Sequence, residues 1–197
     1  DGKHTLTAVV GSNTSLSFTL VKDTAIPTLS GLTGFEASRI VPTFGGVSEP
    51  GATVALSIDG TAIGTTVVGA NGAFTITMTQ AQFAALADSS HTVALTVTDR
   101  AGNQVTASLP WAKDASTAVA VDSVSGSQAS SFALTGTAEA SATVVVTDET
   151  GIQLGSVTAS SDGKWRLLLN NQQTGSHAFT VRATDALGNT ASAKTLA

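Results

Sequence analysis

The chain repeats its own sequence at a nearly constant interval. Residues 184–189 (TDALGN) repeat residues 98–103 (TDRAGN), and residues 176–178 (SHA) repeat residues 90–92 (SHT) at the same spacing of 86 residues. A fixed period of this length is typical of tandem modules, each of which folds as one unit. The repeat therefore divides the 197 residues into domains of ordinary size and argues against one large domain.

A third, shortened copy of the repeat opens the chain. Residues 22–25 (KDTA) resemble residues 113–116 (KDAS), and residues 2–6 resemble the stretch around His91. The sequence therefore predicts three segments. Residues 1–23 are the C-terminal strands of a truncated preceding repeat, and residues 24–113 and 114–197 are complete domains.

Short runs of alternating apolar and polar residues fill both complete repeats. Residues 53–58 (TVALSI) end at a DG turn, and residues 92–98 (TVALTVT) end at DRAG. Alternation with period two is typical of β-strands with one buried face. The predicted fold class is all-β, with tandem immunoglobulin-like seven-stranded β-sandwiches. The expected strands lie near residues 26–32, 39–47, 53–58, 62–68, 73–79, 92–98 and 104–110, and near 118–124, 131–137, 143–148, 152–159, 164–169, 178–184 and 190–196.

Residues 80–87 (QAQFAALA) do not follow the strand pattern. Their Ala, Gln and Leu content predicts a helical turn between the fifth and sixth strands of the first repeat. The second repeat has a shorter polar stretch there. Trp111 also has no counterpart in the second repeat, and it is expected to pack at the junction between the domains.

The composition excludes several classes of function. Only 9 Lys and Arg residues and a net charge of -5 disfavour nucleic acid and anionic membranes as partners. The absence of cysteine excludes thiolate chemistry, and no apolar run has the length of a membrane span. No nucleophile elbow or Ser-His-Asp arrangement lies within one repeat, so we expect that the chain is not an enzyme. We also expect it to be a monomer.

Acidic residues gather at one end of each predicted sandwich. If the strands alternate in direction, the linker before each domain, the second inter-strand loop and the last hairpin all lie at the N-terminal end. The residues placed there are Asp23, Glu49 and Asp99 in the first domain, and Asp114, Glu139 and Asp185 in the second. The opposite end of the first domain receives Asp59, Asp88 and His91.

Two interpretations of the D-x-x-G-N hairpins stay open. Asp99 and Asp185 alone are typical of turns, in which Asp accepts a backbone hydrogen bond and Gly takes a left-handed conformation. With the linker residues Asp23 and Asp114, they also form sets of oxygen ligands of the kind that Ca²⁺ prefers. Close carboxylates repel each other unless a cation neutralises them, whereas linker acids can also simply be solvated.

Several spaced motifs recur in the same order in both repeats. In the first they are G-V-S-E-P-G-A-T-V at 46–54, N-G-A-F at 71–74 and T-D-R-A-G-N at 98–103. In the second they are G-T-A-E-A-S-A-T-V at 136–144, D-G-K-W at 162–165 and T-D-A-L-G-N at 184–189. The chain therefore resembles the bacterial immunoglobulin-like repeats of large secreted or surface adhesins, of the biofilm or host-attachment type.

This resemblance implies a stalk or spacer that is extracellular or exposed on the bacterial cell surface. It further implies structural Ca²⁺ at the junctions, neighbouring repeats of the same chain as partners, and a host or matrix ligand that binds through other regions. The family commonly has a Tyr at the start of the sixth strand, where this chain has His4, His91 and His177. A His can make the same hydrogen bond to a nearby carbonyl, so these three are expected to be structural.

Two other functions remain as alternatives. The domains could themselves bind a host glycan or protein, in which case the extra residues 80–87 are the candidate surface. They could also accompany the catalytic domain of a polysaccharide-degrading enzyme. The low aromatic content of 5% and the absence of Tyr argue against a carbohydrate-binding platform.

Overall fold

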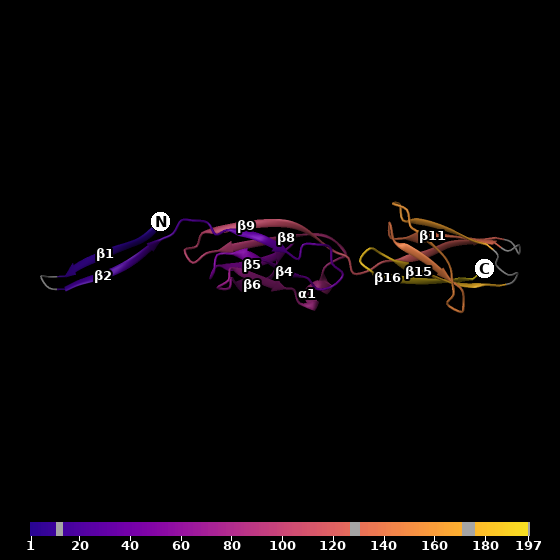
Figure 1. Ribbon diagram of the computed structural model, residues 1–197, viewed down its shortest axis with the longest axis horizontal. Coiled ribbons are helices and arrows are strands. Elements are labelled where there is room, and N and C mark those ends of the chain that lie inside the picture. The colour runs from indigo at the N-terminus through magenta and orange to yellow at the C-terminus, as the bar shows by residue number, and fades with distance from the viewer. Residues whose placement is uncertain (11–13, 127–130, 171–175, 197) are drawn as a thin grey trace. The chain divides into compact units, whose positions relative to one another are not determined.

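The computed structural model describes residues 1–10, 14–126, 131–170 and 176–196 (Figure 1). These residues form two units, Asp1–Lys113 and Asp114–Ala197. None of the helices formed by the described residues has the length and apolar character that a membrane span requires.

The first unit contains a sandwich of two antiparallel sheets (Figure 1). One sheet has the strand order β3-β4-β7 and the other has the order β6-β5-β8-β9. Side chains from both sheets are buried between them, among them Phe44, Ile76 and Leu95. The strand bounds are Leu29–Thr33 for β3, Thr43–Ser48 for β4, Thr53–Ile58 for β5, Thr61–Val67 for β6, Ala73–Thr77 for β7, Ser89–Thr98 for β8 and Gln104–Lys113 for β9.

The second unit has the same arrangement of strands. Its sheets have the orders β10-β11-β14 and β13-β12-β15-β16. Leu134, Val144 and Val181 are fully buried in its core. The strand bounds are Val119–Ser125 for β10, Ser131–Ala138 for β11, Thr143–Thr147 for β12, Gln153–Thr158 for β13, Lys164–Asn170 for β14, Ala178–Thr184 for β15 and Thr190–Leu196 for β16. The predicted fold class, all-β with tandem immunoglobulin-like sandwiches, is confirmed.

A repeated glycine makes room for the largest core residue of each smaller sheet. Gly46 pairs with Phe74 across β4 and β7, and Gly136 pairs with Trp165 across β11 and β14. A Cβ atom on Gly46 would lie 2.8 Å from the Phe74 ring, and one on Gly136 would lie 2.5 Å from the Trp165 indole. Both glycines of the repeated motif therefore serve the packing of an aromatic ring.

A short helix, α1 (Gln80–Ala85), connects β7 to β8, which confirms the predicted helical turn. Thr79 and Gln82 form a capping box at its start. The helix buries Phe83, and the amide of Gln82 donates to the carbonyl of Ile63, which attaches the helix to β6.

Trp111 lies in the core of the first unit, next to this helix. Its side chain is 1% exposed, and its ring centroid lies 5.8 Å from that of Phe44, 6.4 Å from Phe83 and 5.9 Å from His91. The predicted junction position of Trp111 is therefore wrong. The extra helix supplies the apolar partner that the sequence pattern did not assign to Trp111.

Strands β1 (Gly2–Val10) and β2 (Thr14–Lys22) pair as an antiparallel two-stranded hairpin that joins neither sheet of the sandwich. The carboxylate of Asp1 accepts hydrogen bonds from the backbone N–H and the hydroxyl of Thr24, at 2.9 and 2.8 Å. The assignment of residues 1–23 to a preceding repeat stays a prediction.

Candidate functional site

The D-x-x-G-N sequences form the β8–β9 and β15–β16 turns. The Asp185 carboxylate accepts hydrogen bonds from the backbone N–H groups of Leu187 and Asn189, at 2.9 and 2.8 Å. Gly188 has a φ of 83°, in the left-handed region where a side chain would be strained. Asp99 makes the matching bonds in the first unit. The turn interpretation of both hairpins is therefore confirmed.

The last residue of the motif attaches the linker to the hairpin. The Asn189 amide donates to the carboxylate of Asp185 at 2.7 Å and to the backbone carbonyl of Asp114 at 3.1 Å. In the first unit, the amide of Asn103 donates in the same way to Asp99 at 2.8 Å and to the carbonyl of Asp23 at 3.2 Å.

Sequence reasoning treated these asparagines as turn residues and missed this role. The signal that could have revealed it is the joint recurrence of the linker Asp and the hairpin Asn. Each sandwich thus fixes the Asp that precedes it in the chain by a side-chain hydrogen bond.

Three carboxylates come together in the second unit. Asp114, Glu139 and Asp185 each place one oxygen within 4.8 Å of the others. Asn189 also donates to the Asp114 carboxylate at 3.2 Å. Asp185 is buried, Asp114 is half-buried and Glu139 is exposed, so the group is open to solvent on the Glu139 side.

Glu139 lies in a tight turn between β11 and β12. Its carbonyl accepts from the N–H of Ala142 at 3.0 Å, and Ser141 donates to the carbonyl of Ala159 at 3.1 Å. Ser141 has a φ of 66°, in the left-handed region. Glu49 lies in a matching turn of the first unit, so the turn alone does not bring the carboxylates together.

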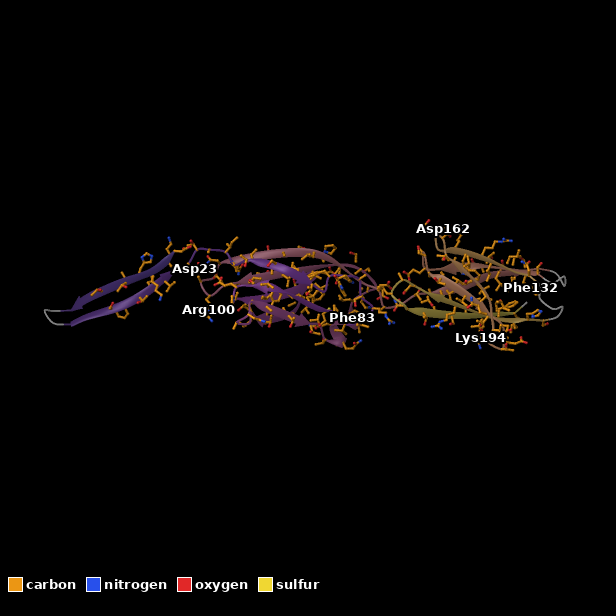
Figure 2. All side chains as sticks on the ribbon, in the orientation of Figure 1. Asp23, Phe83, Arg100, Phe132, Asp162 and Lys194 are labelled. Carbon is orange, nitrogen blue, oxygen red and sulfur yellow. The ribbon has the colours of Figure 1, made fainter. Side chains whose placement is uncertain are left out.

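The first unit does not repeat this arrangement. Within the described residues, Asp23, Glu49 and Asp99 form no group of three neighbouring carboxylate oxygens. The Asp23 carboxylate instead accepts from the N–H of Ala25 at 3.1 Å. Figure 2 shows Asp23 and Arg100 at the same end of the first sandwich. The Arg100 guanidinium lies against the Cα of Gly51, where a Cβ atom would be 2.7 Å from it.

The two hairpins also differ in charge. Arg100 follows Asp99 in the first unit, and Ala186 follows Asp185 in the second. Hydrogen bonding from the Asn103 side chain, with further bonds from backbone N–H groups, lowers the pKa of Asp99 although burial opposes the shift. Among the described residues, the carboxylates that gather are those of the second unit, whose hairpin has no cationic residue next to Asp185.

The histidines take structural positions in both units. The His91 ring contacts the carbonyl oxygen of Ala87 at 2.9 Å, the bond to a nearby carbonyl that the sequence predicts, and also the carboxylate of Asp59 at 2.7 Å. His177 lies against Phe132 and Phe179, with ring centroids 5.2 and 5.9 Å apart. His4 is exposed on the β1–β2 hairpin.

Several solved structures resemble the chain. One is of a 1.5-MDa bacterial ice-binding adhesin, with 21% identity, 87% of this chain and 63% of that chain covered, and a TM-score of 0.48. A second is a tetra-tandem repeat in the extending region of a large adhesion protein, with 24% identity, 93% and 52% covered, and a TM-score of 0.42. A third is a Ca²⁺-stabilized adhesin of an Antarctic bacterium, with 22% identity, 98% and 55% covered, and a TM-score of 0.45.

The chain thus spans between 52% and 63% of the length of these three solved chains. A comparison with curated protein sequences gave no match. Residues 42–114 and 115–197 each match the family described as bacterial Ig domain. These matches cover the second sandwich and all of the first sandwich except β3, and the chain belongs to the bacterial Ig domain family.

Proposed function

We propose that this chain is a spacer of a bacterial surface adhesin, in which tandem domains hold a distal binding region away from the cell. Such a role is extracellular and needs no catalytic group. It is supported by membership of the bacterial Ig domain family and by two sandwiches of the same strand order in one chain. Its partners are the neighbouring repeats of the same chain.

The observation that carries the proposal is the direct connection between the two units. Lys113, the last residue of β9, donates to the carbonyl of Leu86 at 2.8 Å and pairs with the carboxylate of Asp88 at 2.9 Å. The next residue, Asp114, is held by Asn189 of the second unit. Consecutive residues are thus fixed to different units, which leaves no free linker residue between them. A spacer needs such a connection because each free residue adds hinge motion.

NMR relaxation tests this part of the proposal. If the connection restricts the hinge, ¹⁵N relaxation will give the two units similar apparent tumbling times, both longer than that of a free single domain. A variant with Gly-Ser-Gly-Ser inserted between Lys113 and Asp114 is the matched control, and its units will tumble faster and separately. Two independent, short tumbling times in the parent chain would contradict the spacer.

We further propose that Asp114, Glu139 and Asp185 bind a structural Ca²⁺. Carboxylate oxygens are the hard ligands that Ca²⁺ prefers, and three of them at this spacing repel each other without a cation. The bound ion would attach Asp114 more firmly to the hairpin and to the β11–β12 turn. For Asp23, Glu49 and Asp99 the metal role stays a prediction with less support, because the first unit does not gather these carboxylates.

Calorimetric titration with CaCl₂ tests the ion. We expect about one ion per chain, with a Kd on the order of 10⁻⁴ to 10⁻³ M, the range of extracellular modules. Glu139→Gln removes one exposed ligand without touching the turn hydrogen bonds, and it should weaken binding about tenfold or more. Glu149→Gln, an exposed acid in the β12–β13 turn, is the control and should bind like the parent. Equal binding by all three chains would contradict the site.

A further inference from the structure

The β1–β2 hairpin has an apolar face that is open to solvent. Directly paired residues of an antiparallel ladder lie on the same face, and the pairs His4↔Leu20 and Leu6↔Phe18 bring these four side chains together. Leu6 and Phe18 are each 58% exposed, and Leu20 is 57% exposed. A single hairpin cannot bury such a face by itself, and exposed apolar area of this kind marks an interaction surface.

The hairpin matches the β8–β9 hairpin pair for pair. Three cross-strand pairs of β1–β2 have counterparts in the same order in β8–β9. They are Gly2↔Lys22 with Ser89↔Lys113, His4↔Leu20 with His91↔Trp111, and Leu6↔Phe18 with Val93↔Leu109. Asp1 also corresponds to Asp88, since each stands directly before its first strand. Because the register is the same, the two hairpins present equivalent positions on the same face.

In β8–β9 that face is the core face of a sandwich. Val93 is fully buried and Trp111 is 1% exposed, and the Trp111 ring contacts Phe44 of β4. The cover consists of strands that precede the hairpin in the sequence. The corresponding face of β1–β2 therefore fits the same kind of cover, a set of Ig-like strands with an apolar inner face.

The polar groups at the edge of the face point to the same partner. The counterparts of His4 and Lys22 are His91 and Lys113, and their carboxylate and carbonyl acceptors lie between residues 59 and 88, ahead of β8. These acceptors are Asp59, Leu86, Ala87 and Asp88, and His91 has one longer contact within its own strand, to the Ser89 hydroxyl at 3.5 Å. In the hairpin, the side chains of His4 and Lys22 form no hydrogen bond or ion pair with any described residue. A second copy of the hairpin would set these basic groups against each other, whereas the first five strands of an Ig-like domain supply acceptors.

We propose that β1–β2 is the closing hairpin of an Ig-like sandwich, and that its apolar face binds a polypeptide forming the other five strands with the arrangement of β3–β7. The bound hairpin completes a four-stranded sheet in the way that β8–β9 completes the sheet β6-β5-β8-β9. This surface is independent of the carboxylate group of the second unit and of the spacer role.

A fused chain tests the proposal. A second copy of residues 24–87 is placed directly before Asp1, so that it supplies β3–β7 and α1 to the hairpin. Hydrogen exchange measured by mass spectrometry on peptides from residues 1–22 should slow on the order of 100-fold relative to the parent chain. Phe18→Ser in the fused chain should return the exchange to the parent rate.

A second fused variant tests whether side-chain volumes alone prevent the hairpin from packing on the added strands. Leu6→Val, Phe18→Leu and Leu20→Trp give the hairpin the core residues that β8–β9 presents at these positions. If hairpin exchange in this fused variant equals that of the parent chain, the proposal is overturned. It is also overturned if the parent chain forms a dimer that Phe18→Ser dissociates and that persists in the fused chain, because a second copy would then cover the face.

Discussion

Ser141 and Gly51 occupy equivalent turn positions in the two units, but the left-handed backbone conformation is strained only at Ser141. Both follow the Glu of the repeated motif and both have positive φ, 66° for Ser141 and 83° for Gly51. Both N–H groups bond a carbonyl of the facing strand end, Val68 in the first unit and Ala159 in the second. Glycine adopts this conformation without strain, and in the first unit it also leaves room for Arg100.

Ser141→Gly should therefore stabilise the second unit. A left-handed non-glycine residue costs roughly 1–2 kcal/mol, and the added freedom of glycine in the unfolded chain offsets about 0.4–1 kcal/mol. We expect a net gain of about 0.5–1 kcal/mol. Hydrogen exchange of second-unit peptides across a urea series measures this change in the free energy of unfolding. Ser141→Ala keeps the Cβ and should gain nothing, and an equal gain in both variants would exclude backbone strain as the cause.

His91 is held in its charged form by acceptors on both ring nitrogens. A carboxylate and a carbonyl only accept, so the ring donates to Asp59 and to Ala87 at the same time. Burial lowers the pKa of His91, but the hydrogen bonds to Asp59 and Ala87 outweigh burial and raise it, and the nearby Lys113 opposes them. The backbone N–H of Thr92 and the His91 ring lower the pKa of Asp59.

The stability of the first unit should accordingly depend on pH. A raised His pKa stabilises the fold fully below the ordinary value of 6.5, and this contribution is lost as the pH rises through the raised pKa. The lowered pKa of Asp59 stabilises the folded state above the ordinary value of 3.8, and this contribution is lost as the pH falls through the lowered pKa. The pair therefore contributes most between these two values. Denaturation of the parent and of His91→Gln across this range and above it measures the effect, and parallel pH profiles would contradict it.

At the scale of elements, helix α1 closes one end of the first sandwich. Figure 2 shows Phe83 and Arg100 at opposite ends of this unit. Phe83 is 5% exposed, and the Lys113 ammonium lies 5.0 Å from its ring centroid. The extra helix thus adds Phe83 to the core and packs this ring against Lys113, the last residue of β9. It offers no exposed aromatic side chain for the alternative role as a ligand-binding surface.

Phe83→Ala should destabilise the first unit and leave the second unchanged. Truncation of a buried Phe costs about 3–5 kcal/mol, and we expect about 3 kcal/mol because the helix is short and lies at the end of the sandwich. Hydrogen exchange of peptides from each unit in urea separates the two effects. Gln80→Ala, at an exposed position of the same helix, is the control, and its effect should stay within about 0.5 kcal/mol.

Most strands could be predicted from alternation and turn sequences, and the errors have identifiable causes. β5 covers residues 53–58, as predicted, because its buried Val54, Leu56 and Ile58 alternate with less buried residues. β3 and β4 begin later than predicted, each after a proline, Pro27 or Pro42, which cannot donate to a strand ladder.

The candidate site could be predicted only in part. The repeat and the alternating strand directions placed the linker acids next to the hairpins in both units. In the structure, the carboxylates of Asp114, Glu139 and Asp185 lie together, whereas the Asp23 carboxylate bonds the N–H of Ala25. This difference depends on side-chain direction, which no sequence period encodes. Trp111 was misplaced for a similar reason, because its partners Phe44, Phe83 and His91 are far from it in sequence.

At the scale of the whole molecule, the direct step from Lys113 to Asp114 joins two fixed residues. Lys113 is held by Leu86 and Asp88, which follow α1, and Asp114 is held by the β15–β16 hairpin. The anchors differ in kind. The ammonium of Lys113 pairs with the carboxylate of Asp88, whereas the carboxylate of Asp114 joins the two carboxylates of Glu139 and Asp185.

Calcium should therefore reduce hinge motion between the units through the second unit alone. Small-angle X-ray scattering and ¹⁵N relaxation, each with CaCl₂ and with EDTA, should show a narrower distribution of dimensions and more similar tumbling of the two units when calcium is present. Glu139→Gln should remove most of this response because it weakens the ion's hold on Asp114, whereas Arg100→Ala, which alters only the first unit, should keep it. The Gly-Ser-Gly-Ser insertion after Lys113 should still bind calcium but lose the change in tumbling, since the ion then restrains a residue that no longer adjoins β9. A calcium response that survives Glu139→Gln would assign the effect to other carboxylates, and one that survives the insertion would show that the connection does not transmit it.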